Sequence, residues 1–147
     1  MMKRVLFTCL LGGAAALAAC SGSKDGESEG TSQKEAAAVA AAETWLALVD
    51  SGKYAESWEE AAKYFKGVVP KDQWVSGLQP VREPLGKIVS RKVGVKSYET
   101  SLPGAPDGEY VVIQFNTSFE KKALAVETVT PMMDEDGKWR VSGYFIK

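Results

Sequence analysis

The 147-residue sequence contains no histidine, and this absence excludes several kinds of active site at once. Ser-His-Asp triads, zinc sites with imidazole ligands and the usual imidazole general base all require that side chain. Cysteine is also scarce, because Cys9 and Cys20 are the only two. Lysine and arginine together number 18 against 19 aspartates and glutamates, so no excess of positive charge favours nucleic acid or anionic lipid head groups.

The apolar run at residues 5–17 is too short to cross a bilayer as a stable helix, which takes about 20 apolar residues. It follows the charged residues Lys3 and Arg4, and small residues come after it at a cleavage site. These three parts together predict a secretory signal peptide over residues 1–19.

The signal ends in Leu17, Ala18, Ala19 and Cys20, and this ending resembles the lipobox of bacterial lipoproteins. The resemblance implies cleavage before Cys20 and lipidation of its sulfur. Two or three acyl chains anchor a protein durably, because each buried CH₂ group contributes about 0.8 kcal/mol. Ser21 follows Cys20 where an aspartate would retain the protein in the inner membrane, so the resemblance implies the periplasmic face of the outer membrane, if the host has one. The alternative is an ordinary secretory signal cut at another bond.

Cleavage at this point would leave a mature chain without a disulfide. Cys9 would be removed and the sulfur of Cys20 would carry lipid, so the fold would depend on its core alone. Loss of the two basic residues of the signal would change the formal net charge from −1 to −3. Residues 21–31, SGSKDGESEGT, contain no large apolar side chain, so we expect Cys20 and this segment to form a flexible tether. Residues 32–147 have the length of a single domain.

Apolar residues at helical spacing predict three helices at the start of this domain. The first follows a capping box at residues 32–35, is rich in alanine, and is expected to end at Gly52. The second is expected over residues 54–66, with Gly67 ending it.

The third predicted helix is defined by an apolar stripe that consists of Trp74, Leu78 and Val81. Pro70 stands where the first turn of a helix tolerates proline. Pro80 removes a backbone donor and clashes one turn back, so we expect the helix to kink or end there.

From residue 87 onward the sequence alternates with a period of two, which predicts four strands. The first places Arg91 on the same face as Val89, Val93 and Val95. The second covers residues 110–119, with Val111, Ile113, Phe115 and Phe119 on one face, and we expect Phe115 to be buried. The third covers residues 123–133, and a hairpin turn at residues 134–137 leads to the fourth, over residues 139–146. In the fourth, Trp139, Val141 and Phe145 share one face, and Arg140, Ser142 and Tyr144 share the other. Short connections favour an antiparallel meander, so the expected class is α+β, with three N-terminal helices packed on a curved antiparallel four-stranded sheet.

Three helices followed by four strands resemble the nuclear-transport-factor-two-like superfold, also called the ketosteroid-isomerase-like or cystatin-like cone. In that superfold a curved sheet wraps a layer of helices and often leaves a pocket. Residues 136–147, DGKWRVSGYFIK, are similar to its usual final strand.

A closer likeness is carried by Trp45, Arg91 and residues 49–58, 82–86, 102–110, 127–129 and 137–146. In these segments the sequence resembles a bacterial family, domain of unknown function four thousand and nineteen, whose members are often lipoproteins. The likeness extends over nearly all of residues 39–146. The family implies neither an established activity nor catalytic residues.

Three charged residues are the candidate ligand-binding site: Arg82, Arg91 and Glu127. Arg91 and Glu127 each share the face of a predicted strand with valines, and a charge in such a place must be paired or solvated. One interpretation is a structural Arg–Glu pair or a wet sheet edge. The other is the polar floor of a pocket that binds an anionic or hydroxylated ligand.

Other features have two interpretations each. Residues 134–137 are similar to part of a calcium loop, but Gly143 stands where an EF-hand needs glutamate, so a hairpin turn is favoured. Residues 101–107 are either a mobile binding loop or a rigid strand connection. The tryptophans are either core residues, which their spacing favours, or a stacking platform for sugars or rings. They are Trp45, Trp58, Trp74 and Trp139.

Three classes of function are consistent with these observations. The first is a membrane-anchored lipoprotein domain of the cell envelope that binds a small ligand or a protein without catalysis. The second is a carboxylate-dependent isomerase or dehydratase, for which Glu127 is the one candidate base. The third is a structural module that dimerises through its open sheet face. No catalytic residue, metal ligand or cofactor is assigned, and the expected partners are the membrane, through Cys20, and an envelope protein or small ligand.

Overall fold

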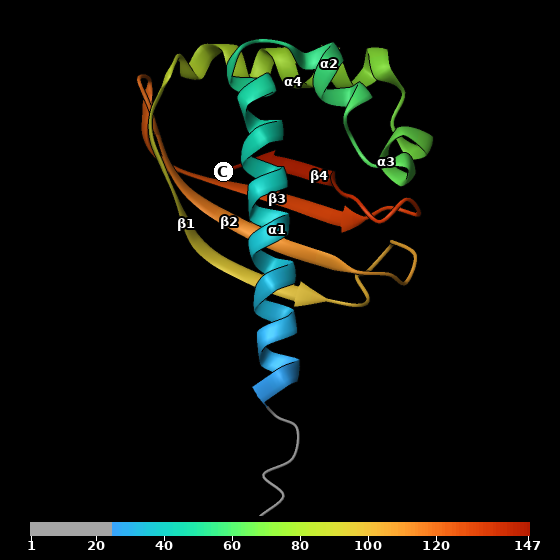
Figure 1. Ribbon diagram of the computed structural model, residues 1–147. Coiled ribbons are helices and arrows are strands. Elements are labelled where there is room, and N and C mark those ends of the chain that lie inside the picture. The colour runs from blue at the N-terminus through green and yellow to red at the C-terminus, as the bar shows by residue number, and fades with distance from the viewer. Residues whose placement is uncertain (1–24) are drawn as a thin grey trace, which may run out of the picture.

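The computed structural model describes residues 25–147, which form an α+β domain (Figure 1). The helices are α1 (Asp25–Asp50), α2 (Tyr54–Glu59), α3 (Lys63–Val68) and α4 (Lys71–Arg82), followed by the 3₁₀ turn η1 (Glu83–Leu85). The strands are β1 (Ile88–Glu99), β2 (Tyr110–Phe119), β3 (Lys122–Met133) and β4 (Trp139–Ile146). The predicted fold class is confirmed, but four α-helices replace the three that were expected.

The four strands form one antiparallel sheet in the order β1-β2-β3-β4, as expected for a meander. Figure 1 shows the sheet curving around α1, which crosses its concave face, while α2 and α4 lie over one end and α3 lies near β4. Every second residue of β2 points inward, and Val111, Ile113, Phe115 and Phe119 are almost completely buried, as predicted. Among residues 25–147, no helix is both long enough and apolar enough to cross a membrane.

The core lies between α1 and the concave face of the sheet. The helix contributes one face of small and large apolar side chains, all buried: Ala38, Ala42, Trp45, Leu46 and Val49. A second, smaller cluster joins α3 to the ends of β2 and β3 through Phe65, Tyr110 and Met132. The expected burial of Phe115 is confirmed at 1% exposure, whereas Trp58 and Trp139 are only partly buried.

The first helix begins at Asp25, earlier than the sequence predicts. Residues 25–31 are therefore helical and not a flexible coil, and Ser32 lies inside the helix and not at a capping position. Once the alanine-rich segment has formed a helix, each further residue adds a hydrogen bond without a new nucleation cost. The gain from these added hydrogen bonds outweighs the low helix propensity of the serine and glycine residues that precede the alanine-rich segment. Cys20 and residues 21–24 lie outside the described residues.

The predicted second helix is interrupted and becomes α2 and α3. Ala61 and Ala62 between them are fully buried, and Ala62 is extended, with ψ of 146°. Its amide donates to the carbonyl oxygen of Val141 in β4 at 2.8 Å. Two side chains of minimal size let the backbone approach the sheet closely, so a tertiary hydrogen bond replaces a helical one. Gly67, expected to end this helix, lies within α3.

The third predicted helix is α4, which continues through Pro80 and ends at Arg82, two residues later. Leu78 is buried as expected, but Val81 is 50% exposed, so its place on the apolar stripe was predicted wrongly. Arg82 occupies the buried position instead, at 3% exposure. Position 82 follows Leu78 by four residues, which places both side chains on one face of the helix.

Irregular pairing changes the predicted faces of two strands. Arg91 and Val93 pair with Thr117 and Phe115 and lie on the inward face, although Val93, in an edge strand, is 40% exposed. Register shifts on either side place Val89 and Val95 on the opposite face, where they are 66% and 59% exposed. Gly94 lies at one shift, where a Cβ atom would be 2.7 Å from the side chain of Asn116.

A further shift between Val129 and Pro131 has the same effect on β4. Tyr144 pairs with the fully buried Val129 and faces inward, whereas Phe145 is 49% exposed, the reverse of the predicted alternation. A single extra residue in a strand moves every later side chain of that strand to the opposite face of the sheet.

Candidate functional site

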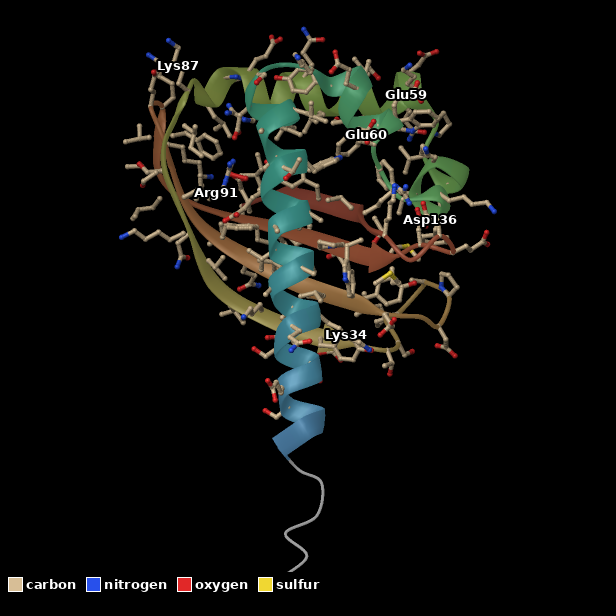
Figure 2. All side chains as sticks on the ribbon, viewed as in Figure 1. Lys34, Glu59, Glu60, Lys87, Arg91 and Asp136 are labelled. Atoms are coloured by element: carbon tan, nitrogen blue, oxygen red, sulfur yellow. The ribbon has the colours of Figure 1, made fainter. Side chains whose placement is uncertain are left out.

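Arg91 of β1 lies at the centre of a buried polar cluster between α1 and the sheet (Figure 2). Its Nη1 and Nη2 atoms donate to Asp50 Oδ2 and Oδ1 at 2.7 and 3.0 Å. Nη2 also lies 2.8 and 2.9 Å from the two carboxylate oxygens of Glu127. A planar guanidinium suits such double recognition, because its donors form a rigid fork. We name the group of Asp50, Arg82, Arg91, Glu127 and Tyr144 the Arg91 cluster.

Arg82 joins the cluster from the last turn of α4, where a positive charge is favourable beside the helix C-terminus. Its Nη2 atom donates to Asp50 Oδ1 at 3.1 Å, and its Nη1 atom donates to the carbonyl oxygen of Gly86 at 2.5 Å. The guanidinium carbon lies 4.6 Å from the ring centroid of Phe119, within the range of a cation–π interaction. Arg82 thereby connects α4 both to α1 and to β2.

Asp50 is the last residue of α1, and a carboxylate at that end of a helix opposes the helix dipole. The two arginines compensate for this position, since both donate to Asp50. On the opposite side of Arg91, Glu127 is completely buried in β3, and the hydroxyl group of Tyr144 in β4 donates to its Oε2 at 3.3 Å.

The charges of the Arg91 cluster balance, because two arginines face two carboxylates. The exposed fractions of the side chains are 0% for Glu127, 4% for Arg82, 13% for Arg91 and 17% for Asp50. Burial by itself lowers the pKa of Arg91, but the bonds to Asp50 and Glu127 outweigh burial and leave that pKa raised. Burial, reinforced by the charge of Glu127, raises the pKa of Tyr144 well above the ordinary phenol value, so its hydroxyl stays protonated as a donor.

The structure brings together all three residues that the sequence singles out, Arg82, Arg91 and Glu127. Asp50 and Tyr144 were missed. In the sequence, Asp50 lies in the turn that is expected to end the helix before Gly52. Its position directly after Val49, which is buried, was the one indication that Asp50 could be buried as well. Tyr144 was assigned to the other face of its strand, because the register shift near Pro131 has no signal in the alternation.

The arrangement favours a structural role for the cluster. Both carboxylates already accept hydrogen bonds from Arg91, whereas a general base needs free access to its substrate. Arg82 Nε, Arg91 Nε and Thr117 Oγ1 are buried without a hydrogen-bond partner among the described residues. The bonds of the cluster connect α1 and α4 to β1, β3 and β4. Whether Arg82, Arg91 and Glu127 also bind a ligand stays a prediction.

A groove of about 700 Å³ lies elsewhere, between α1, α2 and the start of β4. We call it the α1–β4 groove. Its α1 wall consists of Ala40, Ala41, Thr44, Trp45 and Leu48, and its other walls consist of Glu56, Glu59, Glu60, Lys138, Trp139, Arg140 and Val141. Small side chains of α1 create the hollow, while the partly buried Trp139 provides an aromatic wall.

The charged groups around the α1–β4 groove differ in whether they are already paired. Arg140 is bound to Asp134 and Asp136, and Glu59 accepts a bond from Lys71 at 2.5 Å. Glu56 forms an ion pair with Lys53 at 3.8 Å. The side chains of Glu60 and Lys138 form no hydrogen bond or ion pair with another described residue, and both are exposed. The groove therefore offers one carboxylate and one ammonium group to a ligand.

The remaining candidate segments take structural roles. A hairpin turn forms at residues 134–137, as predicted: Gly137 has a φ of 78°, and its amide donates to the carbonyl oxygen of Asp134 at 2.9 Å. The loop between β1 and β2 is tied down by Tyr64 and Tyr110, whose hydroxyl groups donate to the carbonyl oxygens of Gly104 and Pro106. In residues 25–147 no group of three or more side chains is arranged to hold a metal ion.

The tryptophans also contribute to packing. The indole N–H groups of Trp45 and Trp58 donate to the carbonyl oxygens of Ser57 and Val69, each at 2.7 Å. Trp74 donates to Ser57 Oγ at 3.0 Å. Trp139, like Trp45, lines the α1–β4 groove, but it is only partly buried.

Comparison with known proteins gives one match. The model of a family described as protein of unknown function (DUF4019) matches residues 41–144. The matched segment extends from α1 to β4 and contains the whole Arg91 cluster. No curated protein and no solved structure matches the chain.

Proposed function

We propose that this chain, which belongs to the DUF4019 family, is a lipid-anchored domain of the bacterial cell envelope that binds a partner or small ligand without catalysing a reaction. The anchor is the lipid on Cys20 that the lipobox-like ending of the signal implies, and the expected location is the periplasmic face of the outer membrane. We further propose that the sheet curved around α1 is a version of the nuclear-transport-factor-two-like cone.

The α1–β4 groove is the observation that carries the binding role. It is a hollow of about 700 Å³, within the range of small-molecule sites, and it combines an apolar floor with a few polar groups. Its free carboxylate and ammonium groups, on Glu60 and Lys138, can orient a ligand that carries both charges or a short peptide segment. The aromatic face of Trp139 can pack against the body of such a ligand.

The Arg91 cluster supports the absence of catalysis. Glu127 is the one carboxylate that the sequence suggested as a base, and it is buried and held by Arg91 and Tyr144. An isomerase or dehydratase would need a carboxylate exposed to its substrate with a pKa raised toward the working pH. Glu59 in the groove does not meet this need, since the bond from Lys71 lowers its pKa.

The anchor is tested by changing Cys20→Ala in the full chain. We expect the variant to lose lipid labelling and to appear as uncut precursor or in the soluble fraction. A variant that stays lipidated and membrane-bound would show that the lipobox interpretation is wrong.

The groove is tested by native mass spectrometry of the detergent-extracted protein. We expect a bound mass on the unmodified protein that Glu60→Lys removes, because this change places a positive charge where a carboxylate held the ligand. Glu43→Lys, an exposed residue of α1 outside the groove lining, is the matched control and should retain the bound mass. Equal retention by both variants, or no bound mass on the unmodified protein, would contradict the binding role.

Dimerisation is a second candidate, favoured by the outer face of the sheet. Leu124 is 90% exposed there, and Val89, Val95 and Phe145 are exposed as well. The helices lie on the concave side, so they do not cover this face (Figure 1). If the face joins two copies, Leu124→Glu should convert a sedimenting dimer into a monomer, whereas a monomer before mutation would end this candidate.

A further inference from the structure

The N-terminal turns of α1 extend past the sheet. Figure 1 shows these turns continuing beyond the lower edge of the curved sheet, away from the end covered by α2 and α4. At that edge the helix is attached by Lys34, whose ammonium group binds Glu109 and Tyr98, and by Glu35, which lies 3.4 Å from the ammonium group of Lys96. Within residues 28–50 of α1, the first fully buried residue is Ala38. Glu29, Ser32 and Gln33 are exposed.

Few residues separate this helix from the predicted lipid. Only residues 21–24 lie between Cys20 and Asp25, and a chain extends by at most about 3.3–3.6 Å per residue, so about 17 Å is the largest possible span. Residues 25–31 contain acidic residues and no lysine or arginine. An acidic segment is not attracted to anionic lipid head groups, so nothing in its charge favours a helix lying flat on the bilayer.

We propose that residues 25–33 of α1 form a rigid spacer that orients the domain on the membrane and holds the α1–β4 groove in the aqueous phase. The orientation rests on the lipid anchor proposed above. The edge of the sheet near Lys34 then faces the bilayer, and the end formed by α2, α4 and Lys87 faces away from it (Figure 2).

The length of the helix decides which ligands reach the groove. A helix rises 1.5 Å per residue, so the groove residues Ala40 and Leu48 lie about 22 and 35 Å along α1 from Asp25. In the proposed orientation α1 stands upright on the bilayer, so these distances exceed the depth of one head-group layer, roughly 5–8 Å. The groove therefore takes a water-soluble ligand of the envelope, such as a small zwitterion or a peptide segment, and not a lipid extracted from the adjacent bilayer.

Resonance energy transfer tests the orientation in the lipidated full chain. The donor is a dye on one introduced cysteine, and the acceptor is a dye on the lipid head groups. The mature protein would contain no free thiol, because Cys9 would be removed and the sulfur of Cys20 would carry lipid, so an introduced cysteine is labelled alone. We expect strong transfer from a dye at Gln33→Cys and several-fold weaker transfer from a dye at Lys87→Cys. Equal transfer from the two positions would overturn the proposal.

Insertions between Glu29 and Gly30 test the rigidity. A short alanine segment extends the helix and should preserve the difference between the two labels, whereas a Gly-Ser segment of equal length should abolish it. A difference that survives the Gly-Ser insertion would show that α1 does not act as a rigid spacer. Both insertions lie before the packed part of α1, so unchanged thermal unfolding confirms that the domain is intact.

A dye at Thr44→Cys, in the groove, tests the source of the ligand. We expect quenching by iodide in solution and none by a quencher carried on the lipid. Quenching by the lipid-borne group would overturn the aqueous assignment. The Cys20→Ala variant distinguishes a wrong orientation from a wrong anchor. If the lipid anchor is wrong, this variant keeps its membrane binding.

Discussion

Two arginines of this protein are bound in nearly the same way in very different surroundings. Arg91 binds Asp50 through two bonds and Glu127 through the same guanidinium, and Arg140 binds Asp136 through two bonds and Asp134 through another. The distances are alike, from 2.7 to 3.0 Å. We call Arg140 with Asp134 and Asp136 the surface group.

Solvent and sequence separation distinguish the two. In the Arg91 cluster the partners lie 36 and 41 residues from Arg91, and Glu127 is fully buried. In the surface group the partners lie four and six residues from Arg140, whose side chain is 27% exposed; Asp136 is 48% exposed and Asp134 11%. Water screens and replaces the bonds between Arg140 and Asp136, whereas losing one partner in the cluster would leave a buried charge unpaired. Bond geometry alone therefore does not indicate how much an ion pair contributes to folding.

The largest expected effect is that of Glu127→Gln, which retains the shape of the side chain but removes its charge. We expect a loss of about 3–5 kcal/mol in the free energy of unfolding, because Arg91 would lose one of its two buried counter-charges. Denaturant unfolding followed by tryptophan fluorescence measures it. A variant as stable as the unmodified protein would show that the cluster does not hold the fold together, and would reopen a ligand-binding role.

Asp50→Asn should have a smaller effect in the same assay. Asp50 is 17% exposed and can be partly solvated, so we expect a loss of about 1.5–3 kcal/mol, the usual contribution of hydrogen bonds to charged groups. A loss larger than that of Glu127→Gln would mean that the bonds from α1 to α4 and β1 through Asp50 outweigh the bond to β3.

Asp136→Asn is the matched change in the surface group, and we expect almost no shift of the unfolding midpoint. High salt sharpens the comparison, since it screens exposed pairs far more than buried ones. In concentrated sodium chloride the effect of Asp136→Asn should vanish while that of Glu127→Gln persists. If both effects changed equally with salt, burial would not be what separates the two groups.

The smallest effect concerns the acid titration of Asp136. The bond from Arg140 lowers the pKa of Asp136 to about 2. A lowered pKa in the folded state contributes stability above the unfolded value of about 3.9, and this contribution is lost as the pH falls toward 2; it is small here because water screens the exposed Asp136. Arg140→Met should return the pKa of Asp136 toward its ordinary value, as measured by NMR titration. An unchanged pKa would show that Arg140 does not control it.

Local patterns in the sequence were sufficient for much of the fold. The alternation of β2, the hairpin turn before Lys138 and the antiparallel order of the strands all follow from neighbouring residues, because side-chain period and turn chemistry act over short distances. The candidate residues Arg82, Arg91 and Glu127 stood out for the same reason, as charges within apolar segments.

Long-range contacts decided the rest. The register shifts beside Arg91 and Pro131 exchanged strand faces, and the bond from Ala62 to Val141 broke a helix that the local spacing favoured. Asp50 joined the cluster only because the end of α1 lies against β1. Local patterns were thus enough for the fold class and for identifying charges that needed partners. Tertiary packing assigned a partner to each charge, because burial and pairing across 36 or more residues depend on where whole elements lie and not on any local pattern.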